Sequence, residues 1–259
     1  MRFKFLLLLL VILQIFTLSV FAQEATCEVV PIVDFTIFID ENGVANIPEY
    51  INGTLVTSIP TKAFMKNENL KKVVMPSSVI TIESYAFYKC NNLSEVVFSD
   101  NTISIGVDAF AYCKSLTQLV MPLNLQSVFE FAFMNCSNLT TVTFSDNLQS
   151  LGFASFSNCN SLVSLKLGAN TTNIASSAFA GCSSLMSVEI PKTLIRINED
   201  TFANCTSLTK VILRGAETTL SGNAFRNSPL AYTSVEIIVP EVPCETTSEI
   251  ANETSTTIE

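Results

Sequence analysis

Eight phenylalanines recur at a strict interval of 23 residues, and no insertion or deletion interrupts the series. They are Phe64, Phe87, Phe110, Phe133, Phe156, Phe179, Phe202 and Phe225. A fixed period of roughly 20 to 29 residues is typical of solenoids, in which one unit is stacked repeatedly and each unit closes its core only against its neighbours. The sequence therefore predicts a β-rich solenoid of about eight coils, with these phenylalanines in its structural core.

Other positions of the repeat also hold one kind of residue each. A small residue precedes each Phe, a leucine follows six residues later in seven units, and an aliphatic residue follows after eighteen. Nine and eleven residues after each Phe stands an apolar pair such as Val96 and Phe98, which predicts a short strand with one inward face. Stacked coils then align these strands as a parallel ladder with about 4.8 Å between neighbours.

The repeat unit resembles the BspA-like leucine-rich repeat family, whose units read V-x-x-I-x-x-x-A-F-x-x-C-x-x-L-x-x-V-x-I-P. Residues 82–98 match this form closely, and Val188-Glu-Ile-Pro191 supplies the variant with a terminal proline. The resemblance covers about residues 55–235 and implies a leucine-rich repeat right-handed superhelix. Segment 33–62 looks like the family's β-rich N-terminal lead-in. In the last unit Ser228 replaces the cysteine, as expected of a terminal repeat that caps an open core.

We expect four segments along the chain. Residues 1–22 have the form of a signal peptide, with Arg2 and Lys4 before an apolar run and Val20-Phe-Ala22 as the cleavage site; an uncleaved anchor is the alternative. Residues 23–54 form the lead-in or cap, 55–238 the solenoid, and 239–259 a disordered tail rich in Thr, Ser and Glu. No later run reaches the ~20 apolar residues of a membrane span, so we expect a secreted or surface-associated protein.

Catalytic chemistry is not expected from this composition. The chain contains no histidine, which removes the Ser-His-Asp and Cys-His types of catalysis and the common zinc sites. Its carboxylates are scattered singly over outward positions, and there is no glycine-rich phosphate loop. We expect neither an enzyme nor a cofactor nor a metal site. A net charge of −9 without a basic patch also argues against nucleic acid as a partner.

Six of the eight cysteines form a column three residues after Phe: Cys90, Cys113, Cys136, Cys159, Cys182 and Cys205. The Cα atoms of neighbouring cysteines in this column come close enough for a disulfide, but their side chains point the same way and not toward each other. We expect buried free thiols that act as small apolar fillers. Cys27 and Cys244 stand apart, and a bond between them, a local pairing and an intermolecular bridge all remain open.

Asparagine recurs fourteen residues after Phe in four consecutive units, as Asn101, Asn124, Asn147 and Asn170. At a corner, such side chains are expected to bond backbone groups of the turn and of the next coil. Asn170 is also part of an N-x-S/T sequon, but we expect it to be internal. The candidates for glycosylation are Asn52, Asn92 and Asn252; Asn135, Asn138 and Asn204 also lie in sequons.

The outward strand positions, eight, ten and twelve residues after each Phe, form the one surface to which every coil contributes. Our candidate protein-binding residues on it are Val74, Glu95, Val97, Gln118, Val120, Thr141, Thr143, Lys166 and Glu189. Three aligned valines predict an exposed apolar strip of the kind that marks protein contacts, although β-branched residues also simply suit strands. A lectin face that stacks sugars is not expected, because the chain has no Trp and most aromatic residues belong to the core.

The function predicted from these features is adhesion or recognition through the outward strand face. The family resemblance implies extracellular matrix partners of the fibronectin and fibrinogen type, together with surface antigenicity. The alternative is a structural surface-coat protein that self-assembles without a specific ligand.

Overall fold

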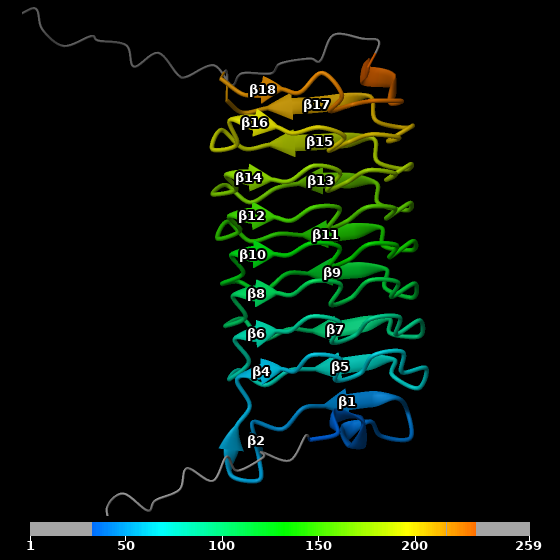
Figure 1. Cartoon of the computed structure of the whole chain (residues 1–259), viewed down its shortest axis with the longest axis vertical. Coiled ribbons are helices and arrows are strands. Elements are labelled where there is room, and N and C mark those ends of the chain that lie inside the picture. The colour runs from blue at the N-terminus through cyan, green and yellow to red at the C-terminus, as the bar shows by residue number, and fades with distance from the viewer. Residues whose placement is uncertain (1–32, 216, 232–259) are drawn as a thin grey trace, which may run out of the picture. The chain divides into compact units, whose positions relative to one another are not determined.

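The computed structural model describes residues 33–215 and 217–231. By its internal contacts the chain divides after Asp34, and the solenoid belongs to the second unit, Phe35–Glu259. It is a parallel β-solenoid of about seven turns with a spacing of about 23 residues (Figure 1), close to the eight coils predicted. The predicted signal peptide and the tail 239–259 lie outside the described residues.

Each turn contributes a longer and a shorter strand, and the strands of each kind follow one another along the axis (Figure 1). We call the first set the long-strand ladder. It consists of β1 (Val44–Asn46), β5 (Lys72–Val74), β7 (Glu95–Val97), β9 (Gln118–Val120), β11 (Thr141–Thr143), β13 (Ser164–Lys166), β15 (Ser187–Ile190) and β17 (Lys210–Leu213).

We call the second set the short-strand ladder. It consists of β4 (Ser58–Ile59), β6 (Thr81–Ile82), β8 (Ser104–Ile105), β10 (Ser127–Val128), β12 (Ser150–Leu151), β14 (Asn173–Ile174), β16 (Arg196–Ile197) and β18 (Thr219–Leu220). The strands β4 to β14 form one six-stranded parallel sheet, and β16 pairs with β18. In this sheet each residue pairs with the residue 23 positions further on, as Ser104 does with Ser127, so the repeat period sets the register.

The eight phenylalanines form one continuous file of rings through the core, as predicted. Seven successive pairs are stacked, with centroids 4.7 to 5.6 Å apart and interplanar angles of 12° or less. All are buried, and only Phe225 at the C-terminal end reaches 7% exposure. Burial of each ring contributes about 1.5–3 kcal/mol, and each aromatic contact adds about 0.5–1.5 kcal/mol. The file therefore couples every turn to both neighbours.

The turn that carries each Phe has an unusual backbone. In the turns from Phe64 to Phe202, the residues two before and two after the Phe adopt positive φ, as Tyr85 (60°) and Lys89 (58°) do around Phe87; around Phe225 only Asn227 does so. This alternation points the amides of Tyr85, Phe87 and Lys89 along the axis, where they donate to carbonyl oxygens of the next turn at 2.7 to 2.9 Å. The left-handed conformation costs about 1–2 kcal/mol for each non-glycine residue. Three interturn hydrogen bonds per coil and the stacked ring offset this cost.

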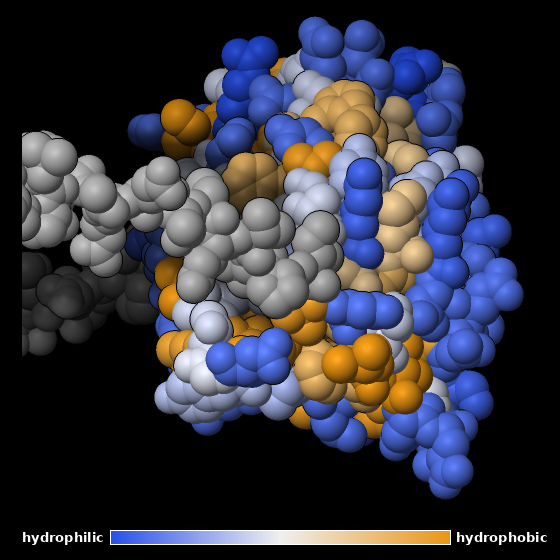
Figure 2. Space-filling model, turned by 60° about the horizontal axis from the view of Figure 1, so that its bottom comes forward, coloured by the Kyte–Doolittle hydropathy of each residue, from blue (hydrophilic) through white to orange (hydrophobic). Residues whose placement is uncertain are grey.

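The N-terminal end of the ring file is covered by Phe35. This residue lies in the 3-10 helix η1 (Phe35–Phe38), is 5% exposed, and meets Phe64 edge-on at 6.1 Å. The apolar run that looked like part of a β-rich lead-in is thus helical over 35–38. Strand character begins at β1, which pairs with β5, and continues in the antiparallel hairpin of β2 (Tyr50–Ile51) and β3 (Thr54–Leu55). Viewed from this end, the surface mixes apolar and polar side chains (Figure 2).

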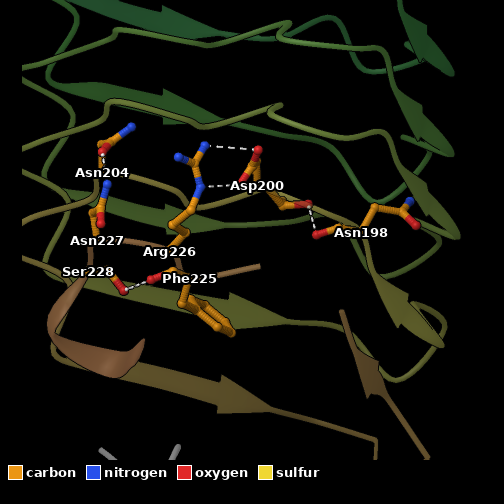
Figure 3. A network of polar contacts seen from close by, with 8 residues as sticks. Asn198, Asp200, Asn204, Phe225, Arg226, Asn227 and Ser228 are labelled. Atoms are coloured by element: carbon orange, nitrogen blue, oxygen red, sulfur yellow. Dashed lines mark hydrogen bonds and ion pairs between the residues drawn. The ribbon is translucent and has the colours of Figure 1, made fainter. Parts of the chain in front are cut away.

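The last described turn is held by polar contacts between neighbouring coils (Figure 3). Arg226 donates two hydrogen bonds to the Asp200 carboxylate, at 2.9 and 3.0 Å. Asn227 donates its amide to Asn204 at 3.0 Å. Ser228, which replaces the cysteine of the other turns, donates its hydroxyl to Phe225 of its own turn at 2.8 Å. The chain then enters the 3-10 helix η2 (Pro229–Ala231).

Candidate functional site

The long-strand ladder places the predicted binding residues on successive strands. In β9, β11 and β13 the central residue is buried and its two neighbours are exposed. Register pairs join Val74 to Val97, Gln118 to Thr141, Val120 to Thr143, and Lys166 to Glu189. The outward side chains therefore lie on one face, at the positions expected from the spacing.

The three aligned valines differ in exposure. Val120 is 74% exposed and Val97 is 40% exposed, whereas Val74 is half-buried on β5 between β1 and β7. Leu123, three residues beyond Val120, is 58% exposed and was not among the predicted residues. The apolar centre of the face is therefore formed by Val97 and Val120, with Leu123 exposed in the turn that follows β9. It lies nearer the middle of the solenoid than the predicted strip.

The long-strand ladder is not continuous between Val97 and Val120. Its strands form three separate sheets, β1-β5-β7, β9-β11 and β13-β15-β17, and Figure 1 shows wider spacings where the sheets part. Both interruptions follow a coil that carries Phe eleven residues after its core Phe, namely Phe98 and Phe144. Where the long strands of two adjacent coils do pair, the first of the two coils carries a methionine or an aliphatic residue at this position, namely Met75, Met121, Leu167 or Ile190.

Contacts of the extra rings explain these interruptions. Phe98 meets Phe110 of the next coil edge-on at 5.8 Å, and Phe144 meets Phe156 in the same way at 5.6 Å. Each ring therefore occupies space between two coils, where a shorter aliphatic side chain lets the strands pair. Val96 and Phe98 are half-buried as a result, although the period-two pattern predicts inward positions for both. This adds partly exposed apolar atoms beside Val97.

The predicted acidic residues of the face are already paired within it. Glu95 contacts Lys72 at 2.7 Å, and Glu189 contacts Arg214 at 3.0 Å. Exposed pairs of this kind contribute only about 0–1 kcal/mol to stability, but they neutralise both acidic groups. Among all outward strand positions the basic residues are Lys72, Lys166, Lys210 and Arg214, and the acidic ones are Glu95 and Glu189. The face is therefore net positive in a chain of net charge −9.

The six cysteines of the column are free and buried, as predicted. Each thiol also donates to the carbonyl oxygen of the core Phe one coil earlier, as Cys90 does to Phe64 at 2.9 Å and Cys136 to Phe110 at 3.2 Å. They therefore act as hydrogen-bond donors as well as fillers. Burial raises the pKa of Cys90, Cys136 and Cys205 to about 12, which keeps these thiols protonated. Cys27 and Cys244 lie outside the described residues.

Two members of the asparagine column bond backbone groups, as predicted, but those of the preceding coil and not of the next one. Asn101 and Asn147 donate their side-chain amides to carbonyl oxygens of the preceding coil, those of Ser77 and Leu123, each at 2.9 Å. Asn124 contacts Asn101 at 3.5 Å. Asn170, which we expected to be internal, is exposed. That prediction was wrong because the buried position of this corner is the next residue, Thr171, whose hydroxyl donates to Leu148.

Two of the three glycosylation candidates can be placed. Asn52 is exposed at the tip of the β2–β3 hairpin, with a φ of 51°. Asn92 is exposed, but its amide donates to the carbonyl oxygen of Glu68 at 2.7 Å. Asn252 lies outside the described residues. Of the two, only Asn52 has a side chain that makes no hydrogen bond with another residue of 33–215 or 217–231.

No group of three or more His, Cys, Asp or Glu that could hold a metal ion occurs within residues 33–215 and 217–231. In the same part of the chain, no helix has the length and apolar character needed to cross a membrane.

The sequence and the fold were compared with known proteins. The family model described as the BspA type leucine rich repeat region matches residues 57–185 and 128–245, with six copies. Among curated proteins, no significant match is found.

Three solved structures are similar to this chain. The leucine rich repeat protein of T. pallidum is 26% identical, with a TM-score of 0.50 over 70% of this chain and 72% of that protein. A leucine-rich repeat protein of Bacteroides ovatus is 24% identical, with a TM-score of 0.49 over 71% of this chain and 61% of that one. A leucine rich cell surface protein of Faecalibacterium prausnitzii is 22% identical, with a TM-score of 0.47 over 76% of this chain and 70% of that one.

Proposed function

The chain belongs to the BspA-type leucine-rich repeat family, and we propose that it is a secreted or cell-surface protein that binds other proteins through the outward face of its long-strand ladder. Repeat proteins of this family are typically found at the cell surface or outside the cell. In solenoids of this kind the extended surface built from all repeats is the usual binding surface.

One observation carries the proposal, namely the exposed apolar centre of this face. Val120 is the most exposed of the large apolar side chains in the described residues, and Val97 and Leu123 are exposed with it. These residues lie on or next to strands of a rigid stack, so little conformational entropy is lost when a partner covers them. Apolar anchors ringed by polar side chains have the arrangement of a binding hot spot.

The charge of the face favours an acidic partner surface. Lys166 and Lys210 have no ion pair within the described residues, and the acidic groups of the face are neutralised by Lys72 and Arg214. We therefore propose extracellular matrix proteins of the fibronectin and fibrinogen type, implied by family resemblance, as partners that dock through acidic segments. The association rate should then fall as salt is raised.

Surface plasmon resonance on immobilised fibronectin and fibrinogen tests this proposal. The variant Val97→Ser/Val120→Ser removes the apolar contact without changing the charge of the face. It should bind at least about 10-fold more weakly, because truncating hot-spot residues costs more than about 1.4 kcal/mol. Ile103→Ser/Ile195→Ser is the matched control, since Ile103 (39%) and Ile195 (63%) are comparably exposed but precede strands of the short-strand ladder. If the wild type and the valine variant bound with equal affinity, the outward face of the long-strand ladder would be excluded as the binding surface.

A structural coat is the competing function. Concentration-dependent growth of particles in light scattering, without retention on either matrix protein, would favour self-assembly over recognition. If the same valine variant then abolished assembly, the exposed apolar centre would be a contact between copies of this chain.

A further inference from the structure

A shallow groove of about 360 Å³ lies at the corner that leads from the long strands to the short strands. Four successive coils line it with Gln126, Asn147, Gln149, Asn170, Thr172 and Thr193. We call it the amide groove. Gln126, Gln149 and Thr172 directly precede β10, β12 and β14, so the pairing of these strands sets the spacing of their side chains.

Three of the lining side chains are used by the fold. Asn147 donates to the carbonyl oxygen of Leu123 at 2.9 Å. The Thr172 hydroxyl donates to the backbone carbonyl oxygen of Gln149 at 3.4 Å, and that of Thr193 donates to the backbone carbonyl oxygen of Thr171 at 2.7 Å. These contacts join adjacent coils and keep the floor of the groove in place.

The other three side chains have no such role. The amides of Gln126, Gln149 and Asn170 are exposed and make no hydrogen bond with any other residue of 33–215 or 217–231. Each amide offers two donor hydrogens and one acceptor oxygen. Gln126 and Gln149 occupy equivalent positions of adjacent coils, at about the 4.8 Å spacing of parallel strands. Asn170 belongs to the asparagine column of the following coil, two residues before the equivalent position. Three consecutive coils thus present free donor and acceptor groups to the same groove.

The chemistry of the groove selects the kind of ligand. None of the six lining residues is charged, so phosphate or carboxylate groups would lack the Arg or Lys partners they normally require. A peptide normally docks on a free strand edge or inserts apolar anchors, but here the neighbouring strands are paired and all six side chains are polar. A hydroxyl group both donates and accepts hydrogen bonds, so it can pair with the N–H donors and with the oxygen acceptor of a side-chain amide.

We propose that the amide groove binds a neutral linear oligosaccharide lying along the solenoid axis, with Gln126, Gln149 and Asn170 bonding hydroxyls of successive sugar units. This site is separate from the outward face of the long-strand ladder. It also differs from the sugar-stacking face that composition made unexpected, since recognition here depends on hydrogen bonds and requires no tryptophan.

Isothermal titration with chitohexaose, cellohexaose and mannohexaose tests the site, with a hyaluronan hexasaccharide as the charged comparator. Because Asn170 also lies in a sequon, the protein should be produced in a bacterial host without N-glycosylation. We expect one neutral hexasaccharide to bind and the charged one to bind more weakly. Each of Gln126→Ala, Gln149→Ala and Asn170→Ala should weaken binding by about 2- to 10-fold.

Gln118→Ala is the matched control, because Gln118 is an exposed glutamine on β9, outside the groove. It should leave sugar binding unchanged, and so should Val97→Ser/Val120→Ser, so that this proposal and the protein-binding proposal fail independently. Absence of binding to all three neutral hexasaccharides would overturn the inference. So would full affinity in the triple alanine variant, or loss of matrix-protein binding instead of sugar binding in that variant.

Discussion

Val97 and Val120 occupy equivalent positions in adjacent coils, yet they belong to different sheets. The ring of Phe98, packed edge-on against Phe110, lies between their coils. The apolar centre of the proposed binding face thus coincides with an interruption of the ladder. One bulky side chain between two coils thereby decides how the outer face is built.

Replacement of Phe98 by leucine should close this interruption. A leucine at the equivalent position, Leu167, precedes a paired strand, so Phe98→Leu should allow β7 and β9 to pair. Amide exchange measured by NMR should slow at residues 118–120. The matched variant Phe144→Leu should instead slow exchange at residues 164–166. Unchanged exchange in both variants would show that the rings do not cause the interruptions.

Ser155 takes the place of alanine before Phe156, and its hydroxyl is buried without a partner in the described structure. An unsatisfied buried hydroxyl costs about 1–3 kcal/mol, so Ser155→Ala should raise the free energy of unfolding by about 1 kcal/mol. Urea denaturation measures this change. Thr201→Ala is the contrasting variant, because Thr201 donates to Asn198 at 2.9 Å; it should destabilise. A loss of stability in both variants would refute the assignment.

The buried thiols should make stability fall at alkaline pH. Below about pH 8.5, the ordinary thiol pKa, the thiols are protonated in both the folded and the unfolded chain, so their contribution to the free energy of unfolding is constant. Above it the unfolded chain loses thiol protons, while burial holds the pKa of Cys90, Cys136 and Cys205 at about 12. Each such thiol should then lower the free energy of unfolding by about 1.4 kcal/mol per pH unit until the folded thiols ionise near pH 12.

Urea midpoints measured between pH 7 and 11 test this dependence. Cys136→Ala removes one of the titrating groups. The free energy of unfolding of this variant should therefore fall by about 1.4 kcal/mol less per pH unit than that of the wild type. The comparison uses slopes and therefore tolerates a lower starting stability of the variant. Identical slopes for the two proteins would contradict the assignment of raised pKa values to the column.

The ion pair of Asp200 and Arg226 should hold the last described turn in place. Hydrogen bonding to Asp200 raises the pKa of the Arg226 guanidinium, and its bidentate geometry makes the contact directional. Arg226→Gln should increase hydrogen exchange of residues 219–228 and leave the central turns unchanged. The exchanged pair Asp200→Arg/Arg226→Asp should restore part of the protection. Protection restored equally by Arg226→Asp alone would rule out charge pairing.

Much of this architecture follows from the sequence, since a repeat without insertions assigns equivalent positions to equivalent residues. Phe64 to Phe225, the buried cysteines and the outward strand positions were all predictable in this way. The positive φ of Tyr85 and Lys89 was not, because glycine, the usual signal for this conformation, occupies the equivalent site only at Gly181. The exposure of Asn170 was also missed, because the one-residue difference between it and the buried Thr171 depends on how the corner bends.

The amino-acid sequence by itself determined the period, the core columns and the family, because these depend on which residue type recurs at which interval. Tertiary structure decided where the long-strand ladder is interrupted, which charges of the face are neutralised and which amides remain free. Those properties arise between coils, where side chains 22 to 26 residues apart compete for the same space and the same hydrogen-bond partners. The residue pattern within one repeat therefore does not predict the outcome of that competition.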